Sequence, residues 1–278
     1  MRPVTRVFAI AMVALSLPSA RAADSPSLSD PLYSGWLKMY DLRFDEAHQI
    51  FAQFRQSRTS DPMGFVSDAA AYLFSELARL GALESELFTD DSKFLNQKQL
   101  TPDPRARQLF AQQMEQADRL TASSLQKNPV DPAALFAKAL SFGLRADYAA
   151  LVDHQYLSAV SYTKDARSIA EKLLVVNPLA FDGYVGPGVE HYLLSLKSAP
   201  LRLLLRLTGS HIDAEQGLAE VRQTALHGRY LEPFAKLLLA VAALRDKQPD
   251  AARKILTELR DRFPHNDLYV RELNRLPH

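Results

Sequence analysis

Residues 231–266, LEPFAKLLLAVAALRDKQPDAARKILTELRDRFPHN, show the most regular spacing of small residues and proline in the chain. It contains two apolar segments of helical spacing, 232–247 and 250–263. Ala240 lies in the first segment, Ala252 lies twelve residues later in the second, and Pro264 follows after another twelve. Small side chains let two antiparallel helices approach closely, and a proline ends a helix because it cannot donate the next backbone hydrogen bond. The stretch therefore predicts a close antiparallel helix pair.

Helical spacing extends along most of the chain. Between residues 148 and 173, apolar and aromatic side chains recur every three or four positions, which predicts one buried face on a single long helix. β-Branched residues are sparse and do not alternate as they would in strands. Glycine and proline lie mostly between the apolar segments. We expect an all-α fold with helices of about 12–20 residues.

The spacing of residues 231–266 recurs upstream with defects. The second-helix sites are 70, 49, 51 and 35 residues apart, so insertions are expected at 80–108, 145–159 and 195–211. The acidic run 84–91 and the apolar run 201–207 fall in two of these insertions, and no proline follows Gly217 at the expected distance. The small residues and prolines that fit the pattern are Gly35, Ala47, Ala117, Pro129, Ala139, Ala166, Pro178, Gly188, Gly217, Ala240, Ala252 and Pro264.

This pattern resembles the tetratricopeptide (TPR) family, whose repeats are 34-residue helix pairs. The resemblance implies an α-solenoid of about five antiparallel helix pairs with insertions, followed by a short C-terminal helix within 266–276. A generic helical bundle is the alternative. The segments 188–209, 213–225 and 228–247 also resemble the inclusion-body-clearance family of helical-repeat proteins. That second resemblance implies helical repeats and an interaction role, and it brings no catalytic residues.

The beginning of the chain predicts export. Residues 1–22 combine a basic start, the uncharged apolar run 7–17 and an A-x-A pattern at Ala20 and Ala22. This order is typical of a bacterial signal peptide, which we expect to be cleaved after Ala22. The mature domain would be residues 23–278, periplasmic or secreted, with no transmembrane segment. The chain has no cysteine, so it can form neither a disulfide nor the lipid anchor of a lipoprotein.

Charge and motifs exclude several function classes. The net charge is +1, and removal of residues 1–22 leaves 30 basic against 32 acidic residues, which gives no reason to expect nucleic acid. The seven histidines form no H-E-x-x-H motif, and the chain has no P-loop, G-x-G-x-x-G or G-x-S-x-G motif. We therefore predict no catalytic residue, no metal and no cofactor.

The segment FDGYVGPGVEHYLLSL, residues 181–196, raises the possibility of a functional loop. Gly188 falls ten residues after Pro178, where the repeat requires its small first-helix residue. Pro187 fits the first turn of a helix, because its missing N–H is not needed there. The helix would then begin near Gly186, or else it begins earlier and bends at Pro187. We interpret the segment mainly as helix packing.

A concave binding surface is predicted in the middle of the chain, where tyrosines concentrate and two insertions flank the region. Aromatic residues and arginine are the side chains that most often anchor interfaces. The favoured function is a non-catalytic scaffold that binds a protein or peptide of the cell envelope. The alternatives are a small-ligand receptor accessory to a transporter and an exported α-helical polysaccharide-active enzyme. The candidate binding residues are Arg145, Tyr148, Tyr162, Tyr184, Glu190, His191 and Tyr192.

Overall fold

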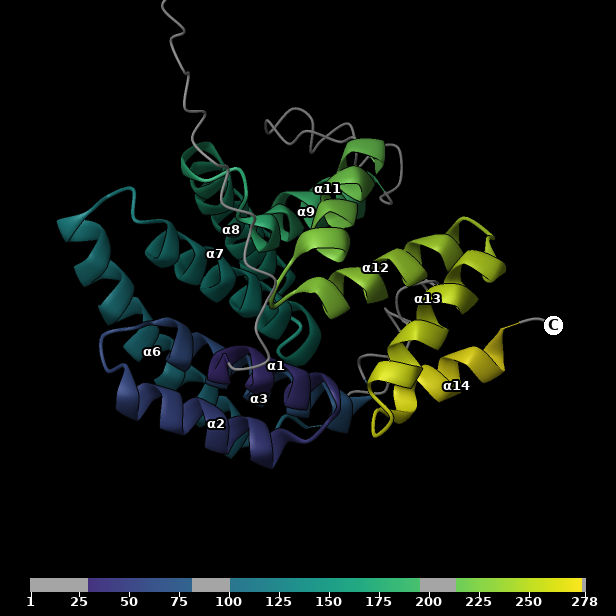
Figure 1. Ribbon diagram of the computed structural model, residues 1–278, viewed down its shortest axis with the longest axis horizontal. Coiled ribbons are helices and arrows are strands. Elements are labelled where there is room, and N and C mark those ends of the chain that lie inside the picture. The colour runs from purple at the N-terminus through teal and green to yellow at the C-terminus, as the bar shows by residue number, and fades with distance from the viewer. Residues whose placement is uncertain (1–29, 82–100, 196–213, 277–278) are drawn as a thin grey trace, which may run out of the picture.

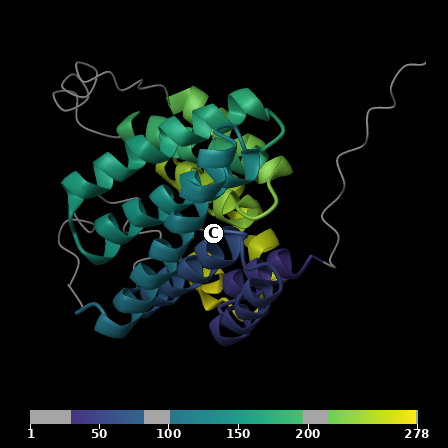
Figure 2. The same cartoon turned by 90° about the vertical axis from the view of Figure 1, so that its left-hand side faces the viewer.

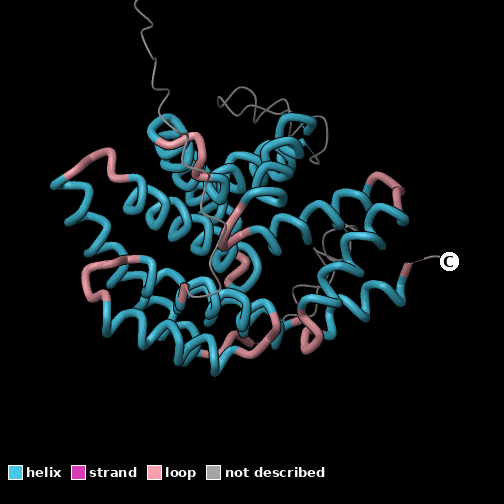
Figure 3. The backbone as a smooth tube through the Cα atoms, in the orientation of Figure 1, coloured by secondary structure: helices cyan, strands magenta, loops and turns pink. Residues whose placement is uncertain are grey.

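The computed structural model describes residues 30–81, 101–195 and 214–276. Within these ranges the regular elements are helices and no strand occurs (Figure 3). None of the described helices has the length and apolar character that crossing a membrane requires. The predicted signal peptide, the acidic run 84–91 and the apolar run 201–207 lie outside the described residues.

The described helices form five consecutive antiparallel pairs and one terminal helix, as the repeat pattern predicts (Figure 1). Within each pair the second helix packs along the first. The pairs are α1 (Pro31–Tyr40) with α2 (Phe44–Ser57), α3 (Met63–Leu80) with α6 (Pro104–Lys127), α7 (Pro132–Asp147) with α8 (Tyr156–Val176), α9 (Val185–Ser195) with α11 (Ala214–His227), and α12 (Glu232–Arg245) with α13 (Pro249–Arg262), followed by α14 (Asp267–Arg275).

Asp-Pro dipeptides begin three of these helices. Asp30, Asp103 and Asp131 each accept a hydrogen bond from the backbone N–H two residues later, at 3.0, 2.8 and 3.0 Å. The proline that follows each aspartate occupies the first helical position, where no N–H is required and its fixed φ suits the helix. These local signals place the starts of α1, α6 and α7 without help from the rest of the chain.

The small residues of the repeat lie where the paired helices touch. All nine predicted alanine and glycine anchors are buried. At Gly188 a Cβ atom would lie 2.9 Å from the backbone oxygen of Gly217, so any larger residue would push α9 and α11 apart. Pro129, Pro178 and Pro264 each lie two residues beyond the end of a second helix. The structure thus confirms the predicted repeat register.

The proline missing after Gly217 has a structural reason. The corresponding position is Arg229, whose N–H donates to both carboxylate oxygens of Asp182, at 2.9 and 3.0 Å. The N–H groups of Tyr230 and Leu231 donate to the same carboxylate. A proline at 229 would remove one of these donors. Gly228 is equally constrained, because an added Cβ would lie 2.8 Å from Asp182 Oδ1.

Aromatic side chains fill the centre, where first helices of several pairs converge. The ring of Tyr230 lies 5.9 Å from that of Trp36 in α1 and 6.1 Å from that of Phe136 in α7. Phe74 of α3 meets Phe234 of α12 edge to face at 6.2 Å. The Trp36 indole N–H donates to Ser67 Oγ at 2.8 Å, which satisfies its one buried polar group. This interior is a packed core.

The first helix pair also packs against the last, so the row of repeats closes on itself (Figures 1 and 2). The Tyr40 ring lies 5.8 Å from that of Phe263, and the Tyr40 hydroxyl donates to the carbonyl oxygen of Tyr230 at 3.0 Å. The Asn266 side chain donates to the Tyr40 carbonyl at 2.9 Å. Asp41 accepts from the backbone N–H of His265 and lies 2.7 Å from its ring nitrogen. We call this contact the seam.

Two expectations about individual helices are wrong. The apolar spacing from 148 to 173 does not form one helix, because a π-helical turn η1 (Tyr148–Val152) ends α7 and the chain reverses at 153–155, where His154 has a φ of 54°. Helix lengths range from 9 to 24 residues, which is broader than predicted.

The expectation that a helix begins near Gly186, with Pro187 in its first turn, is confirmed. A 3₁₀ turn η2 (Phe181–Tyr184) precedes α9, and Pro187 lies in the first turn of α9.

We predict that Ala252→Leu destabilises the protein by about 1–3 kcal/mol, because the larger side chain overpacks the contact between α12 and α13. Ala252 is fully buried, whereas its neighbour Ala251 is exposed. Ala251→Leu is therefore the matched control and should change stability by less than about 0.5 kcal/mol. Urea unfolding of both variants checks this. Equal midpoints for Ala252→Leu and the parent would show that the repeat register is wrong.

Candidate functional site

The predicted binding residues do not gather in one place. Arg145 and Tyr148 lie at the contact between α6 and α7, Tyr162 lies between α7 and α8, and Tyr184 lies in η2. Glu190 and His191 lie on α9 and face α8 and α11. Tyr192 belongs to α9, but its side chain is outside the described residues.

At the α6–α7 contact the predicted residues have structural partners. Arg145 Nη2 lies 2.6 Å from Asp118 Oδ2. The Tyr148 ring is buried and stacks on Phe110 with a centroid distance of 4.5 Å. Burial raises the pKa of the Tyr148 hydroxyl above its usual value. Burial also raises the pKa of the adjacent Asp147 carboxyl to about 7. As described, Tyr148 contributes to packing.

The other two described tyrosines are half-buried. The Tyr162 ring is stacked near Phe142 with a centroid distance of 6.4 Å. The Tyr184 hydroxyl donates to the carbonyl oxygen of Pro178 at 3.2 Å and so ties η2 to the end of the preceding turn. Both rings retain exposed edges that a partner could contact. Their binding role stays a prediction.

A polar cluster between α8, α9 and α11 is the candidate site that the sequence indicated best. Glu190, which is 3% exposed, lies 3.3 Å from Arg167 Nη1. His191 Nδ1 lies 2.9 Å from Glu220 Oε2. Burial raises the pKa of the Glu190 carboxyl, and the nearby Arg167 charge opposes that rise. The second carboxylate oxygen of Glu190 is buried and has no hydrogen-bond partner.

This cluster holds the Arg167–Glu190 ion pair and a hydrogen bond between His191 and Glu220. Within the described ranges, no three His, Asp or Glu side chains are placed to hold a metal ion. The unpartnered oxygen of Glu190 could accept one N–H from a ligand, because a buried carboxylate oxygen without a partner is unfavourable. The sequence analysis named Glu190 and His191 as candidates. It did not name Arg167 or Glu220, because these residues come next to them only through the packing of α8 and α11 on α9.

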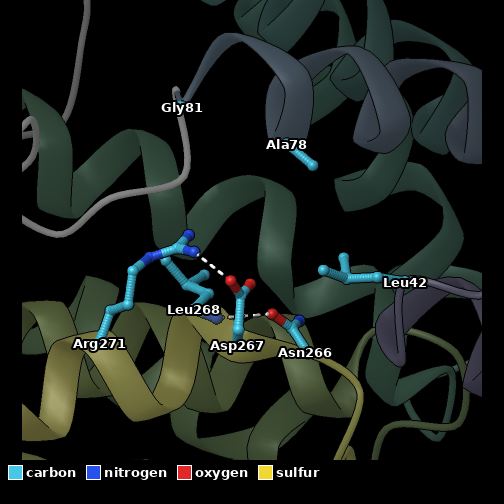
Figure 4. A pocket seen from close by; sticks show the side chains of 7 residues that line it. All are labelled: Leu42, Ala78, Gly81, Asn266, Asp267, Leu268 and Arg271. Atoms are coloured by element: carbon cyan, nitrogen blue, oxygen red, sulfur yellow. Dashed lines mark hydrogen bonds and ion pairs between the residues drawn. The ribbon is translucent and has the colours of Figure 1, made fainter.

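The seam contains a small cavity of about 220 Å³. Figure 4 shows Arg271 turned towards Asp267 on one side and Ala78 and Leu42 on the other. Ligand sites for small molecules usually occupy about 300–1,000 Å³, so this cavity is small for one. It gives little support to the receptor alternative.

The surface of α8 carries a feature that the sequence analysis missed. Six of the nine large hydrophobic side chains exposed among the described residues lie on α8 or in the turn after it. Leu157 is 90% exposed and Val175 is 84% exposed. They are Tyr156, Leu157, Val160, Val175, Val176 and Leu179. They form two apolar groups, one at each end of the helix, and exposed apolar groups of this kind can mark interaction surfaces.

No family model matches the chain, and no curated protein matches it. Among solved structures, the chain is similar to a thermophilic TPR protein of Thermus thermophilus, with 16% identity and a TM-score of 0.43. That similarity covers 88% of this chain and 96% of the other. The TPR-like helical-repeat fold of this chain follows from its helix pairs and their small-residue contacts.

Removal of Arg167 should leave the Glu190 carboxylate buried without its partner. We predict that Arg167→Ala costs about 2 kcal/mol of stability. Glu190→Gln should cost less, because it removes the buried charge and keeps the side-chain shape. Arg222→Ala, at an exposed position on α11, is the control and should have little effect. Urea unfolding of the three variants measures the difference, and an Arg167→Ala variant as stable as Arg222→Ala would contradict it.

Proposed function

We propose that the protein is a non-catalytic, TPR-like scaffold of the bacterial cell envelope that binds a protein partner through the outer face of α8. The observation that carries this proposal is the concentration of exposed apolar side chains on that helix. Side chains such as Leu157 and Val175 gain from burial, at about 25 cal/mol per Å² of apolar surface removed from water. A partner that covers them supplies that burial.

The packed interior supports an outer rather than an inner binding face. Repeat proteins commonly bind along the concave surface lined by one helix of each repeat. Here the rings of Trp36, Phe136 and Tyr230 occupy that space. Tyr184 lies in η2, beyond the C-terminal end of α8, and could contribute at the edge of a partner there, whereas Tyr162 lies on the side of α8 that faces α7.

The location in the envelope is part of the proposal and rests on residues 1–22. We expect the mature protein, isolated from its native host, to begin at Ala23. Amino-terminal sequencing of that material tests this expectation. A chain that retains Met1 or Arg2 would contradict export by a cleaved signal peptide.

The binding proposal is tested by capture from envelope extracts. The mature protein should recover at least one partner, and Leu157→Asp or Val175→Asp should reduce that recovery about tenfold, because each places a charge in the apolar contact. Val270→Asp is the matched control, since Val270 is 42% exposed on α14. All three variants must keep the thermal midpoint of the parent. Equal recovery by the α8 variants and the control would remove α8 as the binding face.

A further inference from the structure

We propose that the partner at α8 is a second copy of this chain, bound antiparallel through a two-fold symmetric contact of α8 with α8. This inference rests on the proposed function, because it names the partner of the same face. The contact would involve the α8 outer stripe, which we define as Leu157, Val160, Lys164, Ser168, Glu171 and Val175.

The stripe forms one continuous face of the helix. Its members recur every three or four residues, which places them along one side of an α-helix. All six are exposed, whereas Ala159, Ala166 and Leu173 on the opposite side are buried. Helix α8 is 21 residues long and therefore spans about 32 Å. Figure 2 views the molecule from the side on which α7 and α8 lie.

The order of residues along the stripe is self-complementary. From Val160 to Val175, in either direction, it reads apolar, charged, small polar, charged and apolar, and the two charges have opposite sign; Leu157 adds a further apolar side chain at one end. A two-fold axis near Ser168 brings Val160 next to the partner subunit's Val175, and Val175 next to the partner subunit's Val160. The same axis directs Leu157, the most exposed of the large hydrophobic side chains that the structure describes, towards the far end of the partner's helix. An isologous contact requires this kind of self-matching surface.

The charges specify the antiparallel register. In that arrangement Lys164 faces the partner subunit's Glu171, and Glu171 faces the partner subunit's Lys164. A parallel arrangement would instead set like charges opposite each other. Glu171 is 54% exposed and already lies 3.3 Å from Arg167 Nε in its own helix, which helps to orient its carboxylate. Exposed ion pairs add little affinity, so their main effect is on specificity, while the apolar ends supply the attraction.

A reversible dimer follows from this composition, because the apolar contacts are confined to the two ends of one helix. Sedimentation equilibrium of the mature protein should show a mass that rises from monomer towards dimer across the micromolar range. Leu157→Asp should keep the protein monomeric over that range. Val270→Asp should dimerise like the parent.

Charge reversal tests the register directly. Lys164→Glu and Glu171→Lys should each weaken self-association, because each creates two like-charge contacts across the axis. An equimolar mixture of the two variants should recover the dimer, since the mixed dimer places opposite charges together at both contacts. Thermal melts of each variant alone show whether the loss of the Glu171 contact with Arg167 affects folding. Recovery in the mixture supports the antiparallel contact, because a merely unfolded variant would not restore it.

Three outcomes overturn the inference. A wild-type dimer that survives both Leu157→Asp and charge reversal places self-association on another surface. If the wild-type protein stays monomeric while the α8 variants lose capture from extracts, the partner is not a second copy, but the proposed function still holds. If the protein is monomeric and its capture of partners does not depend on α8, both the self-association and the proposed binding face are contradicted.

Discussion

The carboxylate of Asp182 is the constraint on which the arrangement of the last two helix pairs depends. It accepts the backbone N–H groups of three successive residues, Arg229 to Leu231, and so fixes the turn between α11 and α12. Burial raises the pKa of this carboxyl, and the three N–H donors oppose that rise. This turn places Tyr230 at the centre of the molecule. There its ring packs on Trp36, and its carbonyl oxygen accepts a hydrogen bond from the Tyr40 hydroxyl. One partly buried acid thereby connects the fourth repeat to the first.

The pairing of helices was predictable because its signals are local. A small residue, a second small residue twelve positions later and a proline after another twelve describe one helix pair by themselves, and Ala240, Ala252 and Pro264 lie where that spacing requires. The break at 153–155 was not predictable from spacing, because apolar residues continue at helical intervals across the reversal. The absence of a proline after Gly217 was not predictable either. It follows from the hydrogen bond that Arg229 donates to Asp182, 47 residues away in the sequence.

The face of each candidate binding residue could not be predicted, because composition shows where aromatic residues are frequent but not which side of a helix they occupy. Tyr148 lies in the part of the chain where tyrosines are frequent, yet its ring packs on Phe110 in the interior. The outer face of α8 did leave a signal. Leu157, Val160 and Val175 are apolar, but they fall on the side of the helix opposite Ala159 and Ala166. Apolar residues on the side of a helix opposite its buried stripe therefore indicate a candidate contact surface.

The seam changes how this row of repeats should respond to stress. In an open array each terminal pair has a single neighbour, and stability is close to a sum of repeat and interface terms, so unfolding can start at an end and spread. Here the first pair contacts both the second and the last, through Tyr40 with Phe263 and Asp41 with His265. No described pair is a free end. The protein should therefore lose its structure as one cooperative unit.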